Sequence, residues 1–308
     1  MEYLDEFRIF YNHTIHPELM RMEDKRKQLV RNFVGLCVAT VGVVLAGFLT
    51  GIPLIGWLAL LLVVMLWVSL FGQVYNYHST FKPNIARLII DFIDNRINFH
   101  DLEYEEKMSI PKATFFESGL FPKMVDEYRG EDYIRGKIGE LPFEMCELSV
   151  KRISPVRERV EDVFRGIFLH ATFSQNTGDG ILVIPRKRKQ YIAAAIQAFA
   201  AKGGKVVDHT IDSPEFGHVF TIIATDNASY VGVLSLEMEE AIYKYHIDTQ
   251  KDVYMSFVGH QIYVAVTQDR DLLEPPILRN NVSYDLVREF YDDLVMLMSI
   301  ILDFDANN

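Results

Sequence analysis

The chain has 308 residues, of which 24% are charged and 49% are hydrophobic, and it carries a net charge of −11 at pH 7. All of that net charge lies beyond residue 72, where 36 acidic residues face 25 basic ones. A domain this acidic is not expected to grip nucleic-acid phosphates through bulk charge, so we expect no nucleic-acid partner. The length allows one or two domains with cores of their own.

Residues 1–31 are predicted to form a helical segment, and fifty residues without Asp, Glu, Lys or Arg follow, from Asn32 to Phe81. Within this block, Phe33–Thr50 has 18 residues and Leu54–Val74 has 21. As helices they would span about 27 and 31 Å, which matches a hydrocarbon core roughly 30 Å thick. We therefore expect residues 32–78 to form a transmembrane hairpin with a tight turn at residues 51–53.

The distribution of basic residues predicts the orientation of this hairpin. The basic residues before the first span are Arg21, Lys25, Arg26, Lys27 and Arg31. Lys82 and Arg87 follow the second span, whereas the turn carries no charge. Because Lys and Arg near span ends stay on the cytoplasmic side, we expect both termini in the cytoplasm. The two cysteines, Cys37 and Cys146, lie far apart in the sequence and fit a reducing compartment.

Small residues recur on one face of the first span, at Gly35, Ala39, Gly42 and Ala46. Their spacing of four and three residues places them on one side of a helix, where a second helix can approach closely. That helix is either the neighbouring span, which the short turn brings near, or a span of another copy of the protein. A homo-oligomer is therefore one of two alternatives.

Residues 79–130 are predicted to be a helical connector. Pro83 at a helix start and an apolar face from Ile85 to Ile93 predict a helix over Asn84–Arg96. A short helix is also predicted over Lys112–Glu117. These helices would lead from the membrane to residue 131, where strand-like patterns begin.

From residue 131 to residue 308 the pattern predicts a cytoplasmic α+β domain. In Val163–Ser174, apolar residues alternate with others at the period of two that is typical of a half-buried strand. Strands are also predicted over Asp132–Lys137, Phe143–Lys151, Gly180–Ile184, Val206–Ile211, Val219–Thr225, Val253–Val258 and Ile262–Thr267, and helices over Lys189–Lys202, Leu234–Tyr245 and Tyr284–Phe304. Short hairpin connections favour an antiparallel sheet with helices packed on one side. The last helix is apolar nearly all round from Leu294 to Leu302, which predicts a core helix in preference to a subunit contact.

A basic run in this acidic domain consists of Arg186, Lys187, Arg188 and Lys189. Such a run is commonly a solvated helix start, but basic side chains at a helix N-terminus oppose the helix dipole. Near an anionic leaflet they could instead bind lipid head groups. We therefore single them out as a contact with membrane lipids or with a partner protein.

Candidate metal ligands cluster at residues 208–218. His209 and His218 would face each other if they stood on two strands joined by the loop Asp212–Gly217, and two His with a carboxylate suit zinc or iron. A solvent-exposed hairpin tip explains the same residues, and their spacing fits no known ligand pattern. We therefore expect no metal and no cofactor, with His209 and His218 as the candidates that would overturn this.

Four short stretches resemble a known family. They are Phe116–Phe121 (FESGLF), Gly130–Gly136 (GEDYIRG), Phe164–Phe168 (FRGIF) and Ser213–Phe216 (SPEF), in this order behind the pair of spans. Together these features resemble a bacterial family of membrane-anchored proteins known as domain of unknown function 3137. The resemblance would cover residues 30–300 and implies a location in the bacterial inner membrane. The family carries no established active site, so the resemblance implies no catalytic residue.

The sequence contains no nucleophile elbow, zinc-protease motif, Walker-type lysine loop or paired Cys-x-x-Cys, and the catalytic residues, if there are any, are unknown. The leading hypothesis is a membrane-anchored adaptor or sensor domain without catalytic activity that binds a partner protein or a signal. The alternatives are a membrane-tethered, hydrolase-like enzyme with dispersed active-site residues and a small-ligand sensor. A cleft with converging titratable side chains would favour the enzyme, a closed apolar pocket the sensor, and a broad exposed apolar patch the adaptor.

Overall fold

The computed structural model describes residues 2–50, 53–94, 99–121, 125–154, 159–173, 176–178, 180–187, 197, 201, 203–228, 234–269, 273 and 277–307. The chain divides into two compact units by its internal contacts. Unit 1 comprises residues 1–92 and 272–290, and unit 2 comprises residues 93–271 and 291–308. The domain boundaries predicted near residues 31, 78 and 130 stay predictions.

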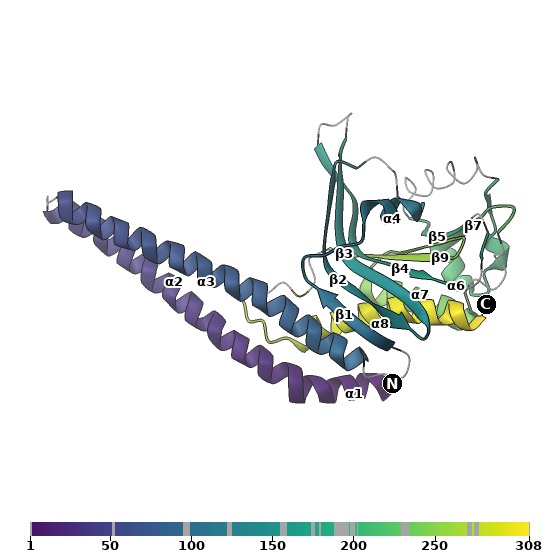
Figure 1. Ribbon diagram of the computed structural model, residues 1–308, viewed down its shortest axis with the longest axis horizontal. Coiled ribbons are helices and arrows are strands. Elements are labelled where there is room, and N and C mark those ends of the chain that lie inside the picture. Colours follow the sequence, from purple (N-terminus) through teal and green to yellow (C-terminus); the bar gives the residue numbers. More distant parts are fainter. Residues whose placement is uncertain are drawn as a thin grey trace. The chain divides into compact units, whose positions relative to one another are not determined.

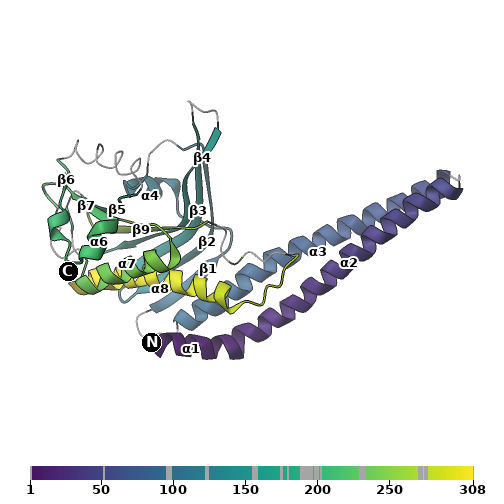
Figure 2. The same ribbon diagram turned by 180° about the vertical axis from the view of Figure 1, so that it is seen from behind.

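Unit 1 consists of the helices at the start of the chain and a returning segment. Helix α1 (Glu2–Phe10) leads through the π-helical turn η1 (Tyr11–Ile15) into α2 (His16–Thr50). Helix α3 (Pro53–Asp94) then runs back beside α2 (Figures 1 and 2). The returning segment contains the first turns of α8 (Tyr284–Asn307), where Tyr284 makes an edge-to-face contact with Tyr11 at 4.9 Å between ring centres.

Helices α2 and α3 contact each other along a narrow seam. The buried residues of this seam are Leu29 and Leu36 on α2 and Val63, Leu70 and Tyr77 on α3. They recur every seven residues on each helix, a spacing typical of two helices that wind around each other. At the middle of the seam, the Nε1 atom of Trp67 donates a hydrogen bond to Oγ1 of Thr40 at 3.2 Å.

Helix α3 continues without a break beyond the second apolar segment. The helix predicted over Asn84–Arg96 is therefore not a separate helix: it is the last part of α3, and Pro83 lies inside α3 instead of at a helix start. A proline in a helix interior removes one backbone hydrogen bond and crowds the preceding turn. The flanking side chains of Phe81, Ile85 and Ile89 are at most 1% exposed, and their burial offsets that cost.

Unit 2 is built on a nine-stranded sheet whose neighbouring strands pair antiparallel. Its strand order is β1-β2-β3-β4-β9-β8-β5-β7-β6. The strands are β1 (Phe99–Glu105), β2 (Glu127–Ile138), β3 (Leu141–Ser154), β4 (Arg159–Thr172), β5 (Ile181–Pro185), β6 (Lys205–Val206), β7 (Phe220–Ala224), β8 (Val253–Val258) and β9 (Gln261–Thr267). The prediction of a mixed fold of helices and an antiparallel sheet is confirmed.

Helices cover both faces of this sheet. Helix α4 (Lys112–Glu117) lies on one face, whereas α7 (Leu236–Thr249) and the later part of α8 lie on the other (Figures 1 and 2). Phe115 of α4 contacts Phe168 of β4 at 5.2 Å between ring centres, and Phe304 of α8 contacts Phe257 of β8 at 4.9 Å. The described helices that were predicted within the α+β domain, α7 and α8, therefore share one face, whereas the other face is covered by α4, which was predicted in the connector. Strands β5 and β7 are buried at every residue, and such strands need cover on both faces.

The stretches that carry the family resemblance have structural roles. Phe121 packs between Phe115 and Phe164, at 4.8 and 4.9 Å between ring centres. Gly166 has a φ angle of +149°, and a Cβ atom there would lie 2.0 Å from the backbone oxygen of Val266. Only glycine therefore lets β4 approach β9 so closely. Ser213 caps the short helix α6 (Pro214–Val219) by accepting a hydrogen bond from the backbone of Phe216.

Several local predictions differ from the structure. The strand predicted over Val206–Ile211 ends at Val206 and gives way to a 3-10 helix, η2 (Asp208–Thr210), and α6 begins within the predicted loop Asp212–Gly217 and extends beyond it. Oδ1 of Asp208 accepts a hydrogen bond from the backbone of Ile222 at 2.9 Å, and this side-chain bond competes with strand pairing. Strand β1 escaped prediction because it is an edge strand with mostly exposed residues. The helix predicted over Lys189–Lys202 falls largely outside the described residues.

The final helix is a core helix in its later part, as predicted. Its fully buried apolar side chains are Leu294, Leu297, Met298, Ile300, Ile301 and Phe304. A helix that is apolar nearly all round is stable in water when it is buried, and the sheet of unit 2 provides that burial.

Candidate functional site

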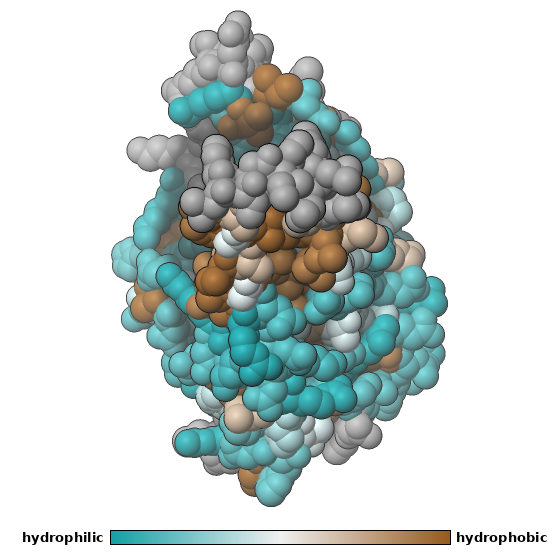
Figure 3. Space-filling view, turned by 90° about the vertical axis from the view of Figure 1, so that its left-hand side faces the viewer, coloured by the Kyte–Doolittle hydropathy of each residue, from teal (hydrophilic) through white to brown (hydrophobic). Residues whose placement is uncertain are grey.

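The outer parts of α2 and α3 expose apolar side chains on most of their surface. In the 18-residue apolar window of each helix only 11% of the residues are buried, and both helices are long and apolar enough to cross a membrane. The most exposed apolar side chains include Val38, Val41, Leu61, Met65 and Val68, which are 59–69% exposed. Figure 3, which faces the outer end of the hairpin, shows hydrophobic side chains gathered beside the grey residues at its centre. A core helix of a water-soluble protein would bury such residues.

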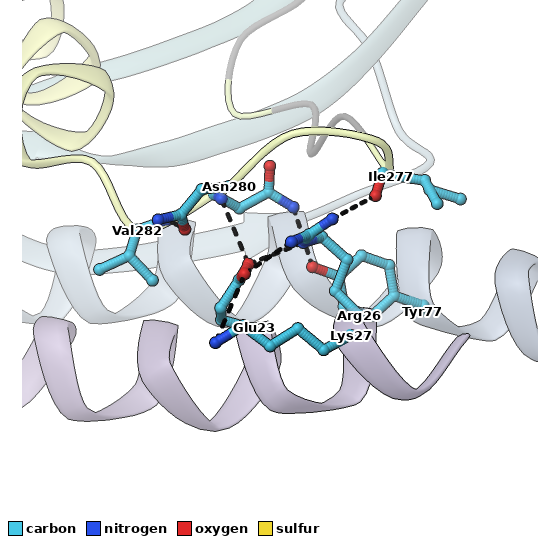
Figure 4. Close-up of polar contacts among 8 residues, drawn as sticks. Glu23, Arg26, Lys27, Tyr77, Ile277, Asn280 and Val282 are labelled. Atoms are coloured by element: carbon cyan, nitrogen blue, oxygen red, sulfur yellow. Dashed lines mark hydrogen bonds and ion pairs between the residues drawn. The ribbon is translucent and has the colours of Figure 1, made fainter. Parts of the chain in front are cut away.

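A buried ion pair lies on α2 just before the apolar segment begins. Arg26 donates from Nε and Nη2 to the two carboxylate oxygens of Glu23, each at 2.7 Å. Its Nη1 atom donates to the backbone oxygen of Ile277 at 2.6 Å (Figure 4). The hydrogen bond from Arg26 lowers the pKa of Glu23, so this carboxyl is ionised at neutral pH. Because three of its donor atoms are used within unit 1, Arg26 is a structural cation.

The returning segment is held to the same place by an asparagine. The backbone N–H of Asn281 points to Glu23 at 3.4 Å, and its side-chain amide donates to the hydroxyl oxygen of Tyr77 at 3.0 Å. Asn281, Glu23 and Tyr77 are each at most 7% exposed. Chain segments separated by about 200 residues or more are thus joined by buried hydrogen bonds, which serve to fix the base of the hairpin.

In unit 2, a row of polar side chains crosses five neighbouring strands. The strand register places Glu103, Arg135, Glu144, His170 and Tyr263 opposite one another, from β1 across to β9. Directly opposite residues lie close and point the same way. Arg135 donates from Nε to Oε2 of Glu103 at 2.8 Å, and Nε2 of His170 lies 3.4 Å from Oε2 of Glu144.

His170 stands out in this row. Its side chain is 17% exposed, and among the described residues no group forms a hydrogen bond with its Nδ1 atom. Burial lowers the pKa of His170, and the neighbouring Glu144 opposes this effect. Burial, together with Glu144, raises the pKa of Tyr133 to about 12, and burial with Glu117 raises that of Tyr263 to about 12. Several titratable groups with perturbed pKa values therefore converge here, which is a feature of functional sites.

An open groove of about 340 Å³ lies over the outer part of this row. It is lined by Asp101, Glu103, Arg135, Gly136, Lys137, Pro142, Phe143, Glu144, His170 and Thr172. The lining presents carboxylates, two cations and one imidazole, so it suits a small polar ligand or a charged peptide segment. A neutral imidazole beside a carboxylate can also take up or release a proton.

A second buried polar cluster in unit 2 has a structural role. Nζ of Lys251 donates to both carboxylate oxygens of Asp293, at 2.8 and 2.7 Å. Tyr245 and Gln268 each donate a further hydrogen bond to Asp293 at 2.5 Å. Burial raises the pKa of Asp293, and its hydrogen-bond donors oppose the rise. The Asp293 side chain is only 1% exposed, so it cannot meet a ligand in solution.

The small-residue stripe of α2 does not face α3 within the chain. Gly35, Ala39, Gly42 and Ala46 are exposed, and a Cβ atom added at Gly35 or Gly42 would meet no atom within 4 Å. The seam with α3 is formed by other residues of α2, Leu29 and Leu36. Packing of the stripe against the neighbouring span, one of the two alternatives, therefore finds no support, whereas its packing against another copy stays a prediction.

The basic run is only partly described. Arg186 donates from Nε to the backbone oxygen of Gly217 at 2.8 Å and from Nη2 to Asp208 at 2.5 Å. Its guanidinium therefore has a structural role within unit 2. Lys187 is exposed. Arg188 and Lys189 lie outside the described residues. Contact of the run with lipid or with a partner protein stays a prediction.

The geometry assumed for a metal at His209 and His218 is wrong. His209 lies in η2 and His218 at the end of α6, so they do not stand on two facing strands. Among the described residues, the side chains that come close enough to share an ion, with oxygen atoms within 4.8 Å of one another, are Glu131, Asp132 and Glu147. Three clustered carboxylates alone do not define a metal site, and neither histidine belongs to this group.

Sequence reasoning did not single out the polar row. The alternation on β4 places Phe168 and His170 on one face, and Glu144 stands two residues before Cys146. What brings Glu144 opposite His170 is the register between β3 and β4. Burial raises the pKa of Cys146 to about 12, which makes this thiol a structural group instead of a nucleophile.

These features describe a protein with an apolar helical hairpin and a mixed unit built on an antiparallel sheet. Residues 162–306 match the family model described as "Protein of unknown function (DUF3137)". The resemblance seen in the sequence is thereby confirmed for this part of the chain, which holds the FRGIF and SPEF stretches.

A search of curated protein sequences found no match. Among solved structures, the chain is similar to the crystal structure of the mycobacterial trehalose monomycolate transport factor A, TtfA, with 8% sequence identity and a TM-score of 0.28. That similarity covers 63% of this chain and 88% of the other. A likeness at this level carries no argument about function.

Proposed function

We propose that the protein is anchored in the bacterial cytoplasmic membrane by α2 and α3, with its N-terminal segment and the α+β unit in the cytoplasm. The observation that supports this most directly is the apolar surface of the hairpin. Only 11% of the residues in the apolar window of each helix are buried. Leaving such side chains in water costs on the order of 1–2 kcal/mol each, and lipid removes that cost. The basic residues at both outer ends of the hairpin support the orientation.

The anchor is tested by extraction and by topology. The protein should stay with the membrane fraction after washing at high pH and should be released by detergent. A reporter that is active only in the cytoplasm should be active when fused at the N-terminus and also when fused after Asn308. Release by the high-pH wash would refute the anchor, and reporters that place the two ends on opposite sides would refute the hairpin.

We further propose that the α+β unit binds a partner protein or a signal through the groove over the polar row. The groove supports this role because it is open, carries both charge signs and contains His170, whose Nδ1 atom has no hydrogen-bond partner in the part of the chain that the structure describes. A photo-crosslinker placed at Lys137, on the rim of the groove, should capture a discrete partner in native membranes. Arg129, whose side chain is 79% exposed outside the groove, is the matched control. Equal products from both positions would refute a role of the groove.

The same groove gives the enzyme alternative a specific basis. His170 and Glu144 converge in it, and such a cleft was the feature expected of an enzyme. In that case His170 would serve as the proton acceptor and Glu144 would orient it. A hydrolase substrate panel run with the wild type and with His170→Gln tests this alternative. Activity that survives the substitution, or no activity in the wild type, would refute it.

A further inference from the structure

A groove of about 280 Å³ lies between α2 and α3 within unit 1, at the base of the hairpin. It is lined by Met22, Lys25, Gln28 and Leu29 from α2 and by Gln73, Asn76, Tyr77, Thr80 and Phe81 from α3. These residues recur at three- and four-residue spacing, so each helix offers one continuous face to the groove. The groove is separate from the polar row of unit 2.

The lining divides into an apolar floor and a polar rim. Met22, Leu29, Tyr77 and Phe81 are buried and form the floor. The rim side chains are exposed, and three of them are carboxamides that can each donate hydrogen bonds: Gln28, Gln73 and Asn76. An apolar floor with a few hydrogen-bond donors at its edge is the usual composition of a site for an amphipathic ligand.

The rim carries one net positive charge. Lys25 is the one charged residue among the residues that line the groove. The nearby Arg26 does not add to this charge, because Glu23 neutralises it in a buried bidentate pair. A negatively charged group is therefore favoured at the rim over a neutral or positive one.

The position along the hairpin indicates which anion lies there. Leu29 stands four residues before the apolar segment that begins at Phe33, and Asn76 stands two residues after the segment that ends at Val74. At 1.5 Å per residue these offsets are about 6 and 3 Å. The head-group layer on each side of a bilayer is roughly 5–8 Å thick. If the hairpin crosses the membrane, the inner part of the groove lies in the head-group layer of the cytoplasmic leaflet. Lys25 stands eight residues before Phe33, about 12 Å from the apolar segment, so it lies at the outer edge of that layer, where its long side chain can reach a phosphate.

We propose that this groove binds an anionic phospholipid of the cytoplasmic leaflet, an inference that rests on the membrane anchor proposed above. Lys25 pairs with the phosphodiester, the amides of Gln28 and Asn76 donate hydrogen bonds to its oxygens, and the floor takes up the first methylene groups of an acyl chain. A soluble phosphate ester has the same phosphate group as the lipid. The apolar floor of the groove favours the lipid, because only the lipid has an acyl chain.

Lipid binding to the full-length chain tests this proposal. The protein is purified in an uncharged detergent, stripped of lipid, and titrated with phosphatidylglycerol or with phosphatidylcholine of the same acyl length, followed by native mass spectrometry. The wild type should bind phosphatidylglycerol about fivefold more tightly, since one basic residue near an anionic surface is worth roughly that factor. Lys25→Gln should abolish this preference. Lys27→Gln is the matched control, because Lys27 is 60% exposed on α2 and does not line the groove.

Further measurements make each outcome decisive. Asn76→Trp, which fills the groove, should weaken binding of both lipids. Equal binding of the two lipids by the wild type, or a preference that survives Lys25→Gln, would overturn the proposal. A loss of preference in Lys27→Gln as large as in Lys25→Gln would also overturn it, because it would indicate diffuse surface charge. If glycerol 3-phosphate bound as tightly as the lipid, the ligand would be a soluble phosphate and the lipid assignment would be wrong.

The result of the lipid-binding experiment can be distinguished from the result of the experiments on the membrane anchor. Membrane extraction and reporter topology test the hairpin without reference to lipid type. A hairpin that crosses the membrane and shows no preference for the anionic lipid would refute only the groove.

Discussion

Replacing Asp293 by Asn should destabilise unit 2 strongly, although the two side chains have nearly the same shape. Asp293 accepts four hydrogen bonds, two of them from Lys251, and these two side chains are 1% and 10% exposed. The substitution removes the negative charge to which the buried Lys251 ammonium donates through two hydrogen bonds, at 2.8 and 2.7 Å. Removing one partner of a buried ion pair costs about 3–5 kcal/mol. For a unit of this size that corresponds to a fall in melting temperature of about 6–20 °C.

Calorimetric unfolding of the full-length chain in detergent measures this change. The control is the exposed pair of Lys205 and Asp226, which are also 2.8 Å apart but 73% and 62% exposed. Asp226→Asn should change the free energy of unfolding by about 1 kcal/mol or less, because water screens exposed pairs.

The double replacement Asp293→Leu with Lys251→Met completes the test. It removes both buried charges together, so it should recover most of the stability lost in Asp293→Asn. A melting temperature of Asp293→Asn equal to that of the exposed control would refute the reasoning. A double variant no more stable than the single one would show that the lost hydrogen bonds, and not the broken ion pair, account for the loss.

Three further predictions concern single positions. Gly42→Leu should leave the melting temperature of the monomer unchanged, because a Cβ atom there meets no atom within 4 Å. The control Leu36→Ala should lower the melting temperature, because it leaves a cavity in the buried seam between α2 and α3. A lower melting temperature for Gly42→Leu would refute this prediction. Burial lowers the pKa of His170 in the folded state. The wild type should therefore lose stability relative to His170→Gln as the pH falls below the pKa of an unfolded histidine, near 6.5. A difference in melting temperature that does not depend on pH would contradict this prediction. Gly166→Ala should cost at least about 1–3 kcal/mol in denaturant unfolding, since its Cβ would overlap the backbone of Val266; an unchanged midpoint would show that β4 can shift.

The sequence by itself determined the elements whose signal is local. The charge-free run from Asn32 to Phe81 predicts two long apolar helices, because its two segments of 18 and 21 residues have the length that an apolar helix needs to cross a hydrocarbon core. The alternation in β4 and the continuous apolar stripe of the final helix likewise predicted a strand and a core helix at these places. Each of these patterns repeats over ten or more residues, and so it outweighs single exceptions.

Single-residue signals proved less reliable. Pro83 predicted a helix start, yet it lies inside α3, because the buried faces on both sides of it outweigh one lost hydrogen bond. Asp208 belongs to a predicted strand and Ser213 to a predicted hairpin loop, but the Asp208 side chain accepts a hydrogen bond from the backbone of β7 and the Ser213 side chain caps α6. The partner of Asp208, Ile222, lies 14 positions along the chain, too far for the sequence to name, whereas Ser213 caps a helix only three residues away that the loop prediction missed.

Only the tertiary structure decided where polar side chains meet. The carboxylate of Glu144 and the imidazole of His170 lie 26 positions apart, and a shift of one residue in the pairing of β3 with β4 would place them on opposite faces of the sheet. The stripe at Gly35 and Gly42 was visible in the sequence, but which way it faces depends on how α2 winds against α3. Periodicity determines which residues share a face of one helix or strand. Packing between helices and strands determines what that face contacts. For this reason the residues that line the two grooves could not be predicted from the sequence alone.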